Sequence, residues 1–375
     1  RIMKILLSAK HRGSTNVLAP IAQELIQRGH ATTIYATGND SEVAGFGNLE
    51  INRVNVNEDD CGVLVRAYDV VVVGLSGELT SDGYFLRAAQ RERVPTVGVL
   101  DQNYNYKERL GKDSQYLPTL LAVMTSECLP KMMEELESTV AEEAVQRSRI
   151  VGWTAYDHLG KIKEQFGDTD RKSLLKRIGV SSDSPLLVYF SQNIHPSADY
   201  FKPTNWSEER KQAFFGYEME LTRAVLDEAQ RLGLSVVVKP HPGEKYEVNF
   251  TEQVARGYNN VKYISAQSCD SKQLMLAADG IVAGRSGCLG EGCLLDRNIG
   301  AVLPMLSVSE REAFTPIALD AIPYAVSWSE IPGIIKIIAR ANTDAITQKF
   351  LSEKRNKFSV DGKASERVAD LIEML

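Results

Sequence analysis

The sequence has few cysteines, and none of them stands in a metal-binding pattern. Cys288 and Cys293 lie only five positions apart, but that spacing is wrong for a zinc knuckle, and no Cys-x-x-Cys pair occurs. An odd, scattered set is also a poor basis for a disulfide framework. We therefore expect a reduced, cytoplasmic protein without a metal site. The five cysteines in the 375 residues are Cys61, Cys128, Cys269, Cys288 and Cys293.

Long apolar runs and an excess of positive charge are also missing. No apolar run approaches the roughly 18 residues that a membrane-spanning helix needs. The apolar stretch near the start of the sequence has only about six residues before polar ones follow, which is too short for a signal-peptide core. The net charge is -6, so nothing suggests a nucleic acid or an anionic membrane as a partner.

What is present is the pattern of a parallel α/β protein. Apolar residues make up 43% of the chain and charged residues 25%, which are ordinary globular values, and the length predicts two domains. Short apolar runs alternate with amphipathic stretches, as in βαβ units. The expected strands are 2–9, 30–37, 68–75, 94–101, 120–126, 148–153, 186–193, 234–240, 261–266, 279–284, 299–304 and 324–328. The clearest expected helices are 16–29, 84–93, 129–145, 208–232, 329–340 and 362–375.

The strand pattern is interrupted once, and this divides the chain. We predict a Rossmann-like domain over residues 1–155, a connection over 156–183 and a second Rossmann-like domain over 184–345. A helical segment over 346–375 closes the structure. The predicted fold is thus α/β, with two tandem doubly wound domains that face a central cleft. Ligands of such sheets bind beyond the carboxyl ends of the strands, so the residues there are the candidates for function.

In the first half, polar residues follow three of the strands. His11, Gly13 and Ser14 lie in the loop after the first strand, where a helix start would suit an anion or a hydroxyl-rich ligand. The same residues would also suit a polar loop with a helix cap. Glu78 follows the third strand. Asp101 closes the fourth, where it could act as a general base or cap the next segment.

Tyr104 follows Asp101 and could stack on a sugar or simply pack against the protein. In the second half, Gln192 comes at the end of the first strand. In "KPHP", Lys239 lies just inside the end of the next strand and His241 lies at that end. The two prolines restrain the backbone on both sides of His241. A lysine and a histidine held in this way suit a phosphate, although His241 could instead pack over the sheet end.

The segment "DGIVAGRSGCLGEGCLLD" (279–296) reads as strand, tight turn and helix. Ser286 and Gly287 fall where the helix begins, and Arg285 adds positive charge there. Glu291 follows inside the helix and could accept hydrogen bonds from a ribose diol. Close packing of a helix on a strand would explain the glycines of this segment, but not Arg285, Ser286 and Glu291 together.

These motifs and their order resemble the GT-B glycosyltransferases over nearly the whole chain, including the "SRIVGWTAYDHL" crossover and the closing "DGKASERVADLIEML". "KPHP" followed by a small-residue turn and a glutamate-bearing helix is similar to three branches. They are the CDP-glycerol glycerophosphotransferases, the bacterial polysialyltransferases and the UDP-N-acetylglucosamine 2-epimerases. The resemblance implies that residues 1–155 form the acceptor-side domain and residues 184–345 the nucleotide-sugar domain. It also implies that His241 and Ser286 contact the phosphates of a nucleotide-sugar and that Glu291 contacts its ribose.

We therefore expect an enzyme that transfers a glycosyl group from a nucleotide-sugar to a small-molecule or glycan acceptor. Lys239, His241, Arg285 and the helix start would stabilise the leaving phosphate without a metal or another cofactor. Asp101 is the first candidate for the base, with His11 second and Glu78 an alternative carboxylate. Two other functions stay open, namely a nucleotide-sugar 2-epimerase or hydrolase and a non-catalytic nucleotide-binding scaffold. The sequence also leaves a homodimer open.

Overall fold

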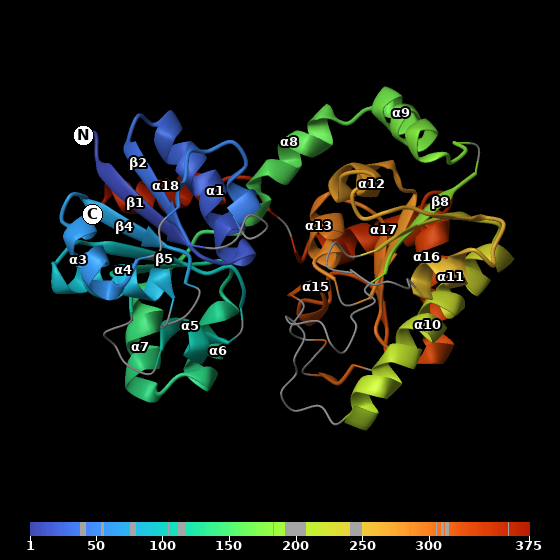
Figure 1. The fold of residues 1–375 in the computed structure, drawn as a ribbon. Helices are drawn as coiled ribbons and strands as arrows, with labels where there is room; N and C mark the ends of the chain where they lie inside the picture. The colour runs from blue at the N-terminus through green and yellow to red at the C-terminus, as the bar shows by residue number, and fades with distance from the viewer. Residues whose placement is uncertain are drawn as a thin grey trace. The chain divides into compact units, whose positions relative to one another are not determined.

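The computed structural model of the protein forms two compact units (Figure 1). One contains residues 1–158 together with 360–375, and the other contains residues 159–359. None of the helices in the described ranges combines the length and the apolar character needed to cross a bilayer. The residues that the structure describes are 1–37, 43–53, 56–75, 80–103, 105–111, 117–182, 184–191, 208–240, 250–284, 286–304, 306–308, 311, 315–358 and 360–375.

The first unit is built on a seven-stranded sheet in the order β3-β2-β1-β4-β5-β6-β7, with parallel pairing throughout. Its strands are β1 (Lys4–Ala9), β2 (Ala31–Ala36), β3 (Asn52–Arg53), β4 (Val70–Val73), β5 (Thr96–Val99), β6 (Leu120–Val123) and β7 (Ser148–Ile150). Its helices are α1 (Arg12–Gln27), η1 (Ala44–Phe46), α3 (Glu58–Val65), α4 (Ser81–Arg91), α5 (Tyr106–Leu110), α6 (Cys128–Glu135), α7 (Ser138–Arg147), η3 (Thr154–Tyr156) and α18 (Ala364–Glu373).

Helix α18 lies beside α1 although most of the chain separates them in sequence (Figure 1). Arg28 of α1 donates to the Asp370 carboxylate at 2.7 Å. Asp157 caps the start of α18, because its carboxylate accepts from the backbone N–H of Ala364 at 3.1 Å and of Ser365 at 2.6 Å. Residues 360–375 are therefore a structural part of the first unit.

The second unit is built on a six-stranded parallel sheet in the order β10-β9-β8-β11-β12-β13. Its strands are β8 (Leu186–Phe190), β9 (Ser235–Lys239), β10 (Val261–Tyr263), β11 (Gly280–Ala283), β12 (Ile299–Val302) and β13 (Tyr324–Ala325). Helix α8 (Asp157–Gln165) leads into this unit. Its other helices are α9 (Asp168–Ile178), α10 (Glu208–Arg231), α11 (Phe250–Ala255), α12 (Ser271–Ala277), α13 (Cys288–Leu294), α15 (Thr315–Ala318), η4 (Trp328–Glu330), α16 (Ile331–Arg340) and α17 (Ala345–Arg355).

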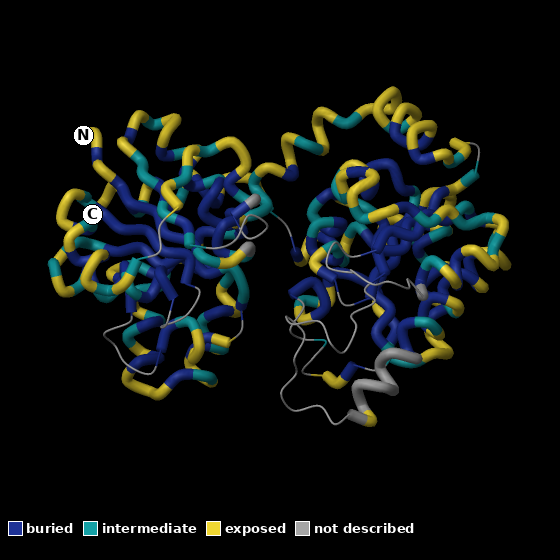
Figure 2. The backbone as a smooth tube through the Cα atoms, viewed as in Figure 1, coloured by how far each residue is buried: buried dark blue, intermediate teal, exposed yellow. Residues whose placement is uncertain are grey.

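The central strands of both sheets lie inside the core, which explains their continuous apolar sequences (Figure 2). All four valines of β4 are fully buried. Along β1 the side chains alternate between faces. Ile5 and Leu7 join the core cluster under α1 and α18, while Leu6 lies outside that cluster. In the second unit, α16 buries four isoleucines against its sheet.

The expected doubly wound α/β fold is confirmed, and each of the expected strands is present. Strand β3 was not expected, because it has only two residues and no apolar alternation. The single helix expected over 129–145 is wrong. Two helices, α6 and α7, occupy this stretch, and Leu136 between them has an extended backbone (φ -94°, ψ 158°). Helix α17 was not expected as a separate helix, although it lies almost entirely within the helical segment expected over 346–375. It buries only Leu351 and Arg355.

Candidate functional site

Each sheet has one point where the strand order reverses, between β1 and β4 in the first unit and between β8 and β11 in the second. In open α/β sheets, ligands bind outside the carboxyl ends of the strands at this point. His11, Gly13 and Ser14 follow β1, and Ser286, Gly287 and Glu291 follow β11. The topology therefore places these sequence-predicted residues at the two reversal points.

In the first unit, Asp101 lies directly against Gly13. A Cβ atom added at Gly13 would lie 1.8 Å from Asp101 Oδ2, so only glycine leaves room for the carboxylate. Gly13 belongs to the first turn of α1, where backbone N–H groups and the helix dipole favour negative charge. The helix start that the sequence offered to an outside anion thus already has a carboxylate of the protein beside it.

Arg109, on the short helix α5, forms an ion pair with Asp101. Arg109 Nη1 donates to Asp101 Oδ1 and also to the Leu75 carbonyl oxygen, at 3.2 Å in the second case. The two side chains are only 16% and 11% exposed, so solvent screens the pair weakly. Sequence reasoning missed Arg109, which is eight positions from Asp101 and follows Asn105, a residue with a left-handed backbone (φ 58°).

The turn between β1 and α1 packs tightly on the end of β4. Ser14 Oγ accepts from the His11 backbone N–H at 3.1 Å and donates to the His11 carbonyl at 2.8 Å, so this hydroxyl closes the first turn of α1. A Cβ atom added at Gly74 would lie 2.4 Å from Ser14 Cβ. His11 itself is exposed at the helix N-cap. The chain thus holds the α1 start in place and leaves the imidazole accessible.

A second buried carboxylate, that of Asp82, lies near the carboxyl ends of the strands in the same sheet. Ser8 Oγ donates to Asp82 Oδ1 at 2.7 Å, and the two residues are 0% and 1% exposed. Asp82 stands in the first turn of α4, whose N-cap is Thr80. The sequence did carry a signal for this position, because a threonine followed by an aspartate two residues later is typical of a helix start.

In the second unit, Lys239 ends β9 and is 2% exposed. Its ammonium donates to the Ala266 carbonyl oxygen, and burial lowers the pKa of Lys239 below its ordinary value. Ser191 follows the neighbouring strand β8, and its backbone N–H donates to the Lys239 carbonyl at 3.2 Å. Ser191 is buried, and its hydroxyl oxygen has no hydrogen-bond partner within the described ranges.

Helix α13 begins directly after Ser286 and Gly287, as the sequence predicted. Ser286 is buried, and its hydroxyl accepts from the Cys288 backbone N–H at 3.2 Å. Burial raises the pKa of the Cys288 thiol to about 12, so it is neutral at physiological pH. A Cβ atom added at Gly287 would meet nothing within 4 Å. Glu291 Oε1 lies 3.7 Å from Lys272 Nζ, on α12.

The structure thus brings Asp101 to Gly13 in the first unit, and places Ser191, directly after β8, beside Lys239 at the end of the paired strand β9 in the second. The roles of these residues stay predictions. Five candidates lie outside the described residues: Glu78, Tyr104, Gln192, His241 and Arg285. Within the described ranges, no group of three or more His, Cys, Asp or Glu side chains is arranged to hold a metal ion.

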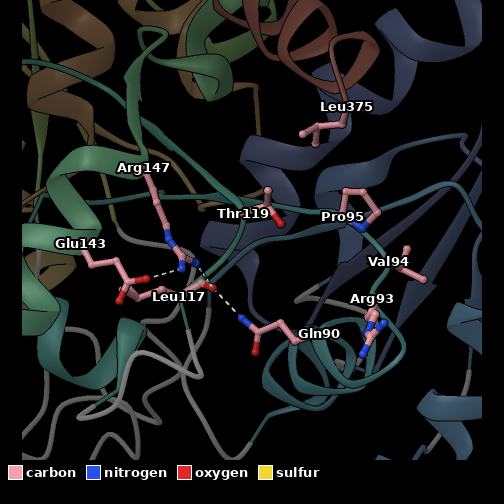
Figure 3. A pocket seen from close by; sticks show the side chains of 9 residues that line it. All are labelled: Gln90, Arg93, Val94, Pro95, Leu117, Thr119, Glu143, Arg147 and Leu375. Atoms are coloured by element: carbon pink, nitrogen blue, oxygen red, sulfur yellow. Dashed lines mark hydrogen bonds and ion pairs between the residues drawn. The ribbon is translucent and has the colours of Figure 1, made fainter.

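A separate pocket of about 550 Å³ opens at the opposite ends of the strands in the first sheet (Figure 3). Pro95 and Thr119 directly precede β5 and β6, so this pocket lies at the amino ends of the strands, away from Asp101. Arg147 spans it by donating to the Leu117 and Pro118 carbonyls, both at 2.9 Å, and to Glu143. The lining residues are Gln90, Arg93, Val94, Pro95, Leu117, Thr119, Glu143, Arg147 and Leu375.

Several solved structures match the fold of this chain over nearly its full length. A UDP-GlcNAc 2-epimerase from Neisseria meningitidis bound to UDP-GlcNAc has a TM-score of 0.68 and 14% identity, with 100% of each chain covered. A glycosyltransferase from Rickettsia africae has a TM-score of 0.66 and 11% identity, covering 100% of this chain and 99% of that one. MnaA from S. aureus, solved with UDP, has a TM-score of 0.64 and 16% identity, covering 99% and 96%.

No protein-family model and no curated protein matches the sequence. At identities of 11% to 16%, the solved structures establish the fold alone. Their full-length match agrees with the two parallel sheets and with the resemblance found in the sequence. The chain has the GT-B fold.

Proposed function

We propose that the protein is a glycosyltransferase that moves a sugar from a nucleotide-sugar to an acceptor. The second unit binds the nucleotide-sugar, and the first unit supplies the base that activates the acceptor. The observation that carries the proposal is the set of polar groups at the ends of β8, β9 and β11. Lys239 ends β9, Ser191 directly follows the paired strand β8, and Ser286 follows β11, which pairs with β8 on its other side.

These groups suit the phosphates of a nucleotide-sugar. A buried hydroxyl without a partner, such as that of Ser191, costs free energy that a ligand phosphate would offset. The buried ammonium of Lys239 lies at the same sheet edge and would stabilise the charge that grows on the leaving phosphate. The space beside Gly287 would allow close approach to the backbone. The similar structures that hold UDP or UDP-GlcNAc support this ligand class.

In the first unit, Asp101 is the leading candidate for the base and His11 the second. Asp101 has a carboxylate held at a strand end, which is a suitable place for a group that must meet an acceptor hydroxyl. No metal is part of this proposal, since Lys239 and the neighbouring polar groups would carry the electrostatic stabilisation. We therefore expect turnover to be unchanged by excess EDTA.

The second candidate function is epimerisation or hydrolysis of a nucleotide-sugar, which the similar epimerase structure favours. The hydrolysing 2-epimerases carry Gly-Asp-Thr and Glu-Ala-Gly segments after two strands of the first domain. This chain has "GLSGEL" and "VLDQNY" in those places. The absence of both segments is why we place transfer first.

Incubation with UDP-, CMP-, GDP- and TDP-sugars, first without and then with candidate glycan acceptors, separates the functions. We expect slow hydrolysis at most without an acceptor, and sugar transfer with one. Rapid formation of an epimer or of free sugar would contradict the transferase proposal. A chain that binds none of these nucleotides in calorimetry would contradict both enzyme functions.

Asp101→Asn tests the base. The amide keeps the size and one acceptor oxygen but cannot take a proton, so kcat should fall about 100-fold or more, while KM for the nucleotide-sugar changes little. Steady-state kinetics with thermal unfolding as a control measure this. Similar losses in kcat and in nucleotide-sugar affinity would argue against a base and would favour His11.

A further inference from the structure

Arg109 fixes one oxygen of Asp101 and leaves the other in a defined place. Its Nη1 group donates to Asp101 Oδ1, while Oδ2 lies in the space that a side chain at Gly13 would need. The carboxylate is therefore held from two sides. With both side chains mostly buried, the geometry persists without competition from bulk water.

Arg109 is in turn anchored to a different strand. The same Nη1 group donates to the carbonyl of Leu75, two residues past β4, whereas Asp101 follows β5. A single guanidinium nitrogen thus ties the carboxyl ends of two neighbouring strands to one carboxylate. Arg109 Nε is buried and has no hydrogen-bond partner within the described ranges. An unsatisfied buried donor lowers the stability of the folded state, so the observed position of this side chain has a cost in free energy.

We propose that Arg109 is a positioning residue that acts on catalysis through Asp101. This rests on the proposed function. The pair fixes the orientation of the carboxylate, so that Oδ2 rather than either oxygen at random meets the acceptor hydroxyl. A base that must be held within about half an ångström of its productive position depends on such support. Arg109 need not touch the acceptor or the nucleotide-sugar itself.

A purely structural role makes a different prediction, and a double-mutant cycle distinguishes the two. If Arg109 acts through Asp101, Arg109→Met should lower kcat about 30- to 100-fold in the wild-type background and have little further effect in the Asp101→Asn background. Arg109→Lys keeps the charge and should recover about tenfold of that loss. KM for the nucleotide-sugar should stay within about twofold in all of them, because the second unit binds it.

Arg147→Met is the matched control. Arg147 belongs to the same unit and also combines a carboxylate partner with backbone carbonyls, but it lies at the other edge of the sheet (Figure 3). We expect its kcat to stay within about twofold of wild type even where its thermal stability falls. If Arg109→Met does not fold, the cycle is run with Arg109→Lys. Its decrease in kcat should likewise disappear in the Asp101→Asn background.

The outcomes separate this inference from the function on which it rests. Losses that multiply in the double variant, or a loss in Arg109→Met no larger than in Arg147→Met, would overturn the positioning role while the enzyme remains a transferase. A wild-type chain that transfers no sugar from any of the tested donors would overturn the proposed function and the positioning role together.

Discussion

The two reversal points use the same element, a strand followed by a tight turn and a helix, but they differ in what lies beside the turn glycine. At Gly13 the space is filled by the Asp101 carboxylate. At Gly287 a Cβ atom would meet nothing within 4 Å. Gly13 in the first turn of α1 thus lies against a carboxylate of the protein, whereas the N-cap Gly287 has room for a side-chain carbon.

The polar side chains near the two helix starts also differ in how far the protein itself supplies their hydrogen-bond and ion-pair partners. In the first unit the polar side chains are paired with each other, as in Asp101 with Arg109 and Ser8 with Asp82. In the second unit, Ser191 is buried without a partner for its hydroxyl oxygen within the described ranges, and burial depresses the pKa of Lys239. In the first unit the protein supplies the partner of each of these carboxylates, although Arg109 Nε has none within the described ranges. In the second unit a bound anion would supply a partner for the Ser191 hydroxyl and so add stability.

The largest expected effect comes from exchanging the two glycines for alanine. Gly13→Ala forces Asp101 out of its place or shifts α1, so we expect a loss of about 1–3 kcal/mol in unfolding free energy and a kcat lowered at least as much as in Asp101→Asn. Gly287→Ala is the matched change in open space. It should leave stability unchanged and raise KM for the nucleotide-sugar. Thermal unfolding and steady-state kinetics measure both.

The opposite result would break the comparison. If Gly287→Ala unfolded as easily as Gly13→Ala, the space beside Gly287 would not be open. If Gly13→Ala kept wild-type stability and kcat, the contact between Asp101 and the α1 start would not matter to the protein.

A smaller effect is expected from the pH dependence of Lys239. Because burial lowers its pKa in the folded state, the unfolded chain binds more protons in the window below the ordinary value of 10.5. Stability from this group should therefore rise with pH across that window. Lys239→Met removes the titration, so the wild type should gain stability relative to the variant as the pH rises from 7 towards 10. Parallel curves from denaturant unfolding would show that Lys239 is not desolvated.

The smallest effect is expected at Ser191. Ser191→Ala removes a buried hydroxyl whose oxygen has no partner within the described ranges, so the unfolding free energy should rise by about 1 kcal/mol. If the hydroxyl contacts a ligand phosphate, calorimetry should show UDP binding several-fold weaker in this variant. Unchanged UDP affinity would remove Ser191 from the binding groups and leave Lys239 and Ser286 as candidates.

Sequence reasoning succeeded where one local pattern decides the structure. Runs such as that of β4 are apolar on both faces because both faces are covered, and this pattern needs no knowledge of distant residues. It failed where the signal is short or weak. Strand β3 has two exposed residues, and α17 has an exposed Ile346 and few buried positions, so neither shows a clear period.

For the candidate site, the sequence likewise predicted the features that depend on local pattern and missed those that depend on distant contacts. Strand ends could be located, so Asp101, Lys239 and Ser286 were found as candidates. Their partners could not be, because contacts between loops depend on backbone directions that the sequence does not encode locally. Arg109 reaches Asp101 from helix α5, which begins after the left-handed residue Asn105, and the Ala266 carbonyl that binds Lys239 belongs to a different loop.

The docking of α18 on α1 has a consequence for how the protein is made. Val368, Ala369 and Ile372 are part of the core formed by β1 and α1, and the Asp157 carboxylate caps α18. A ribosome would therefore release residues 1–158 long before their core can close, while residues 159–359 can complete their own sheet first. During synthesis, the first unit to emerge is therefore the last to finish folding, because part of its core comes from the final helix of the chain.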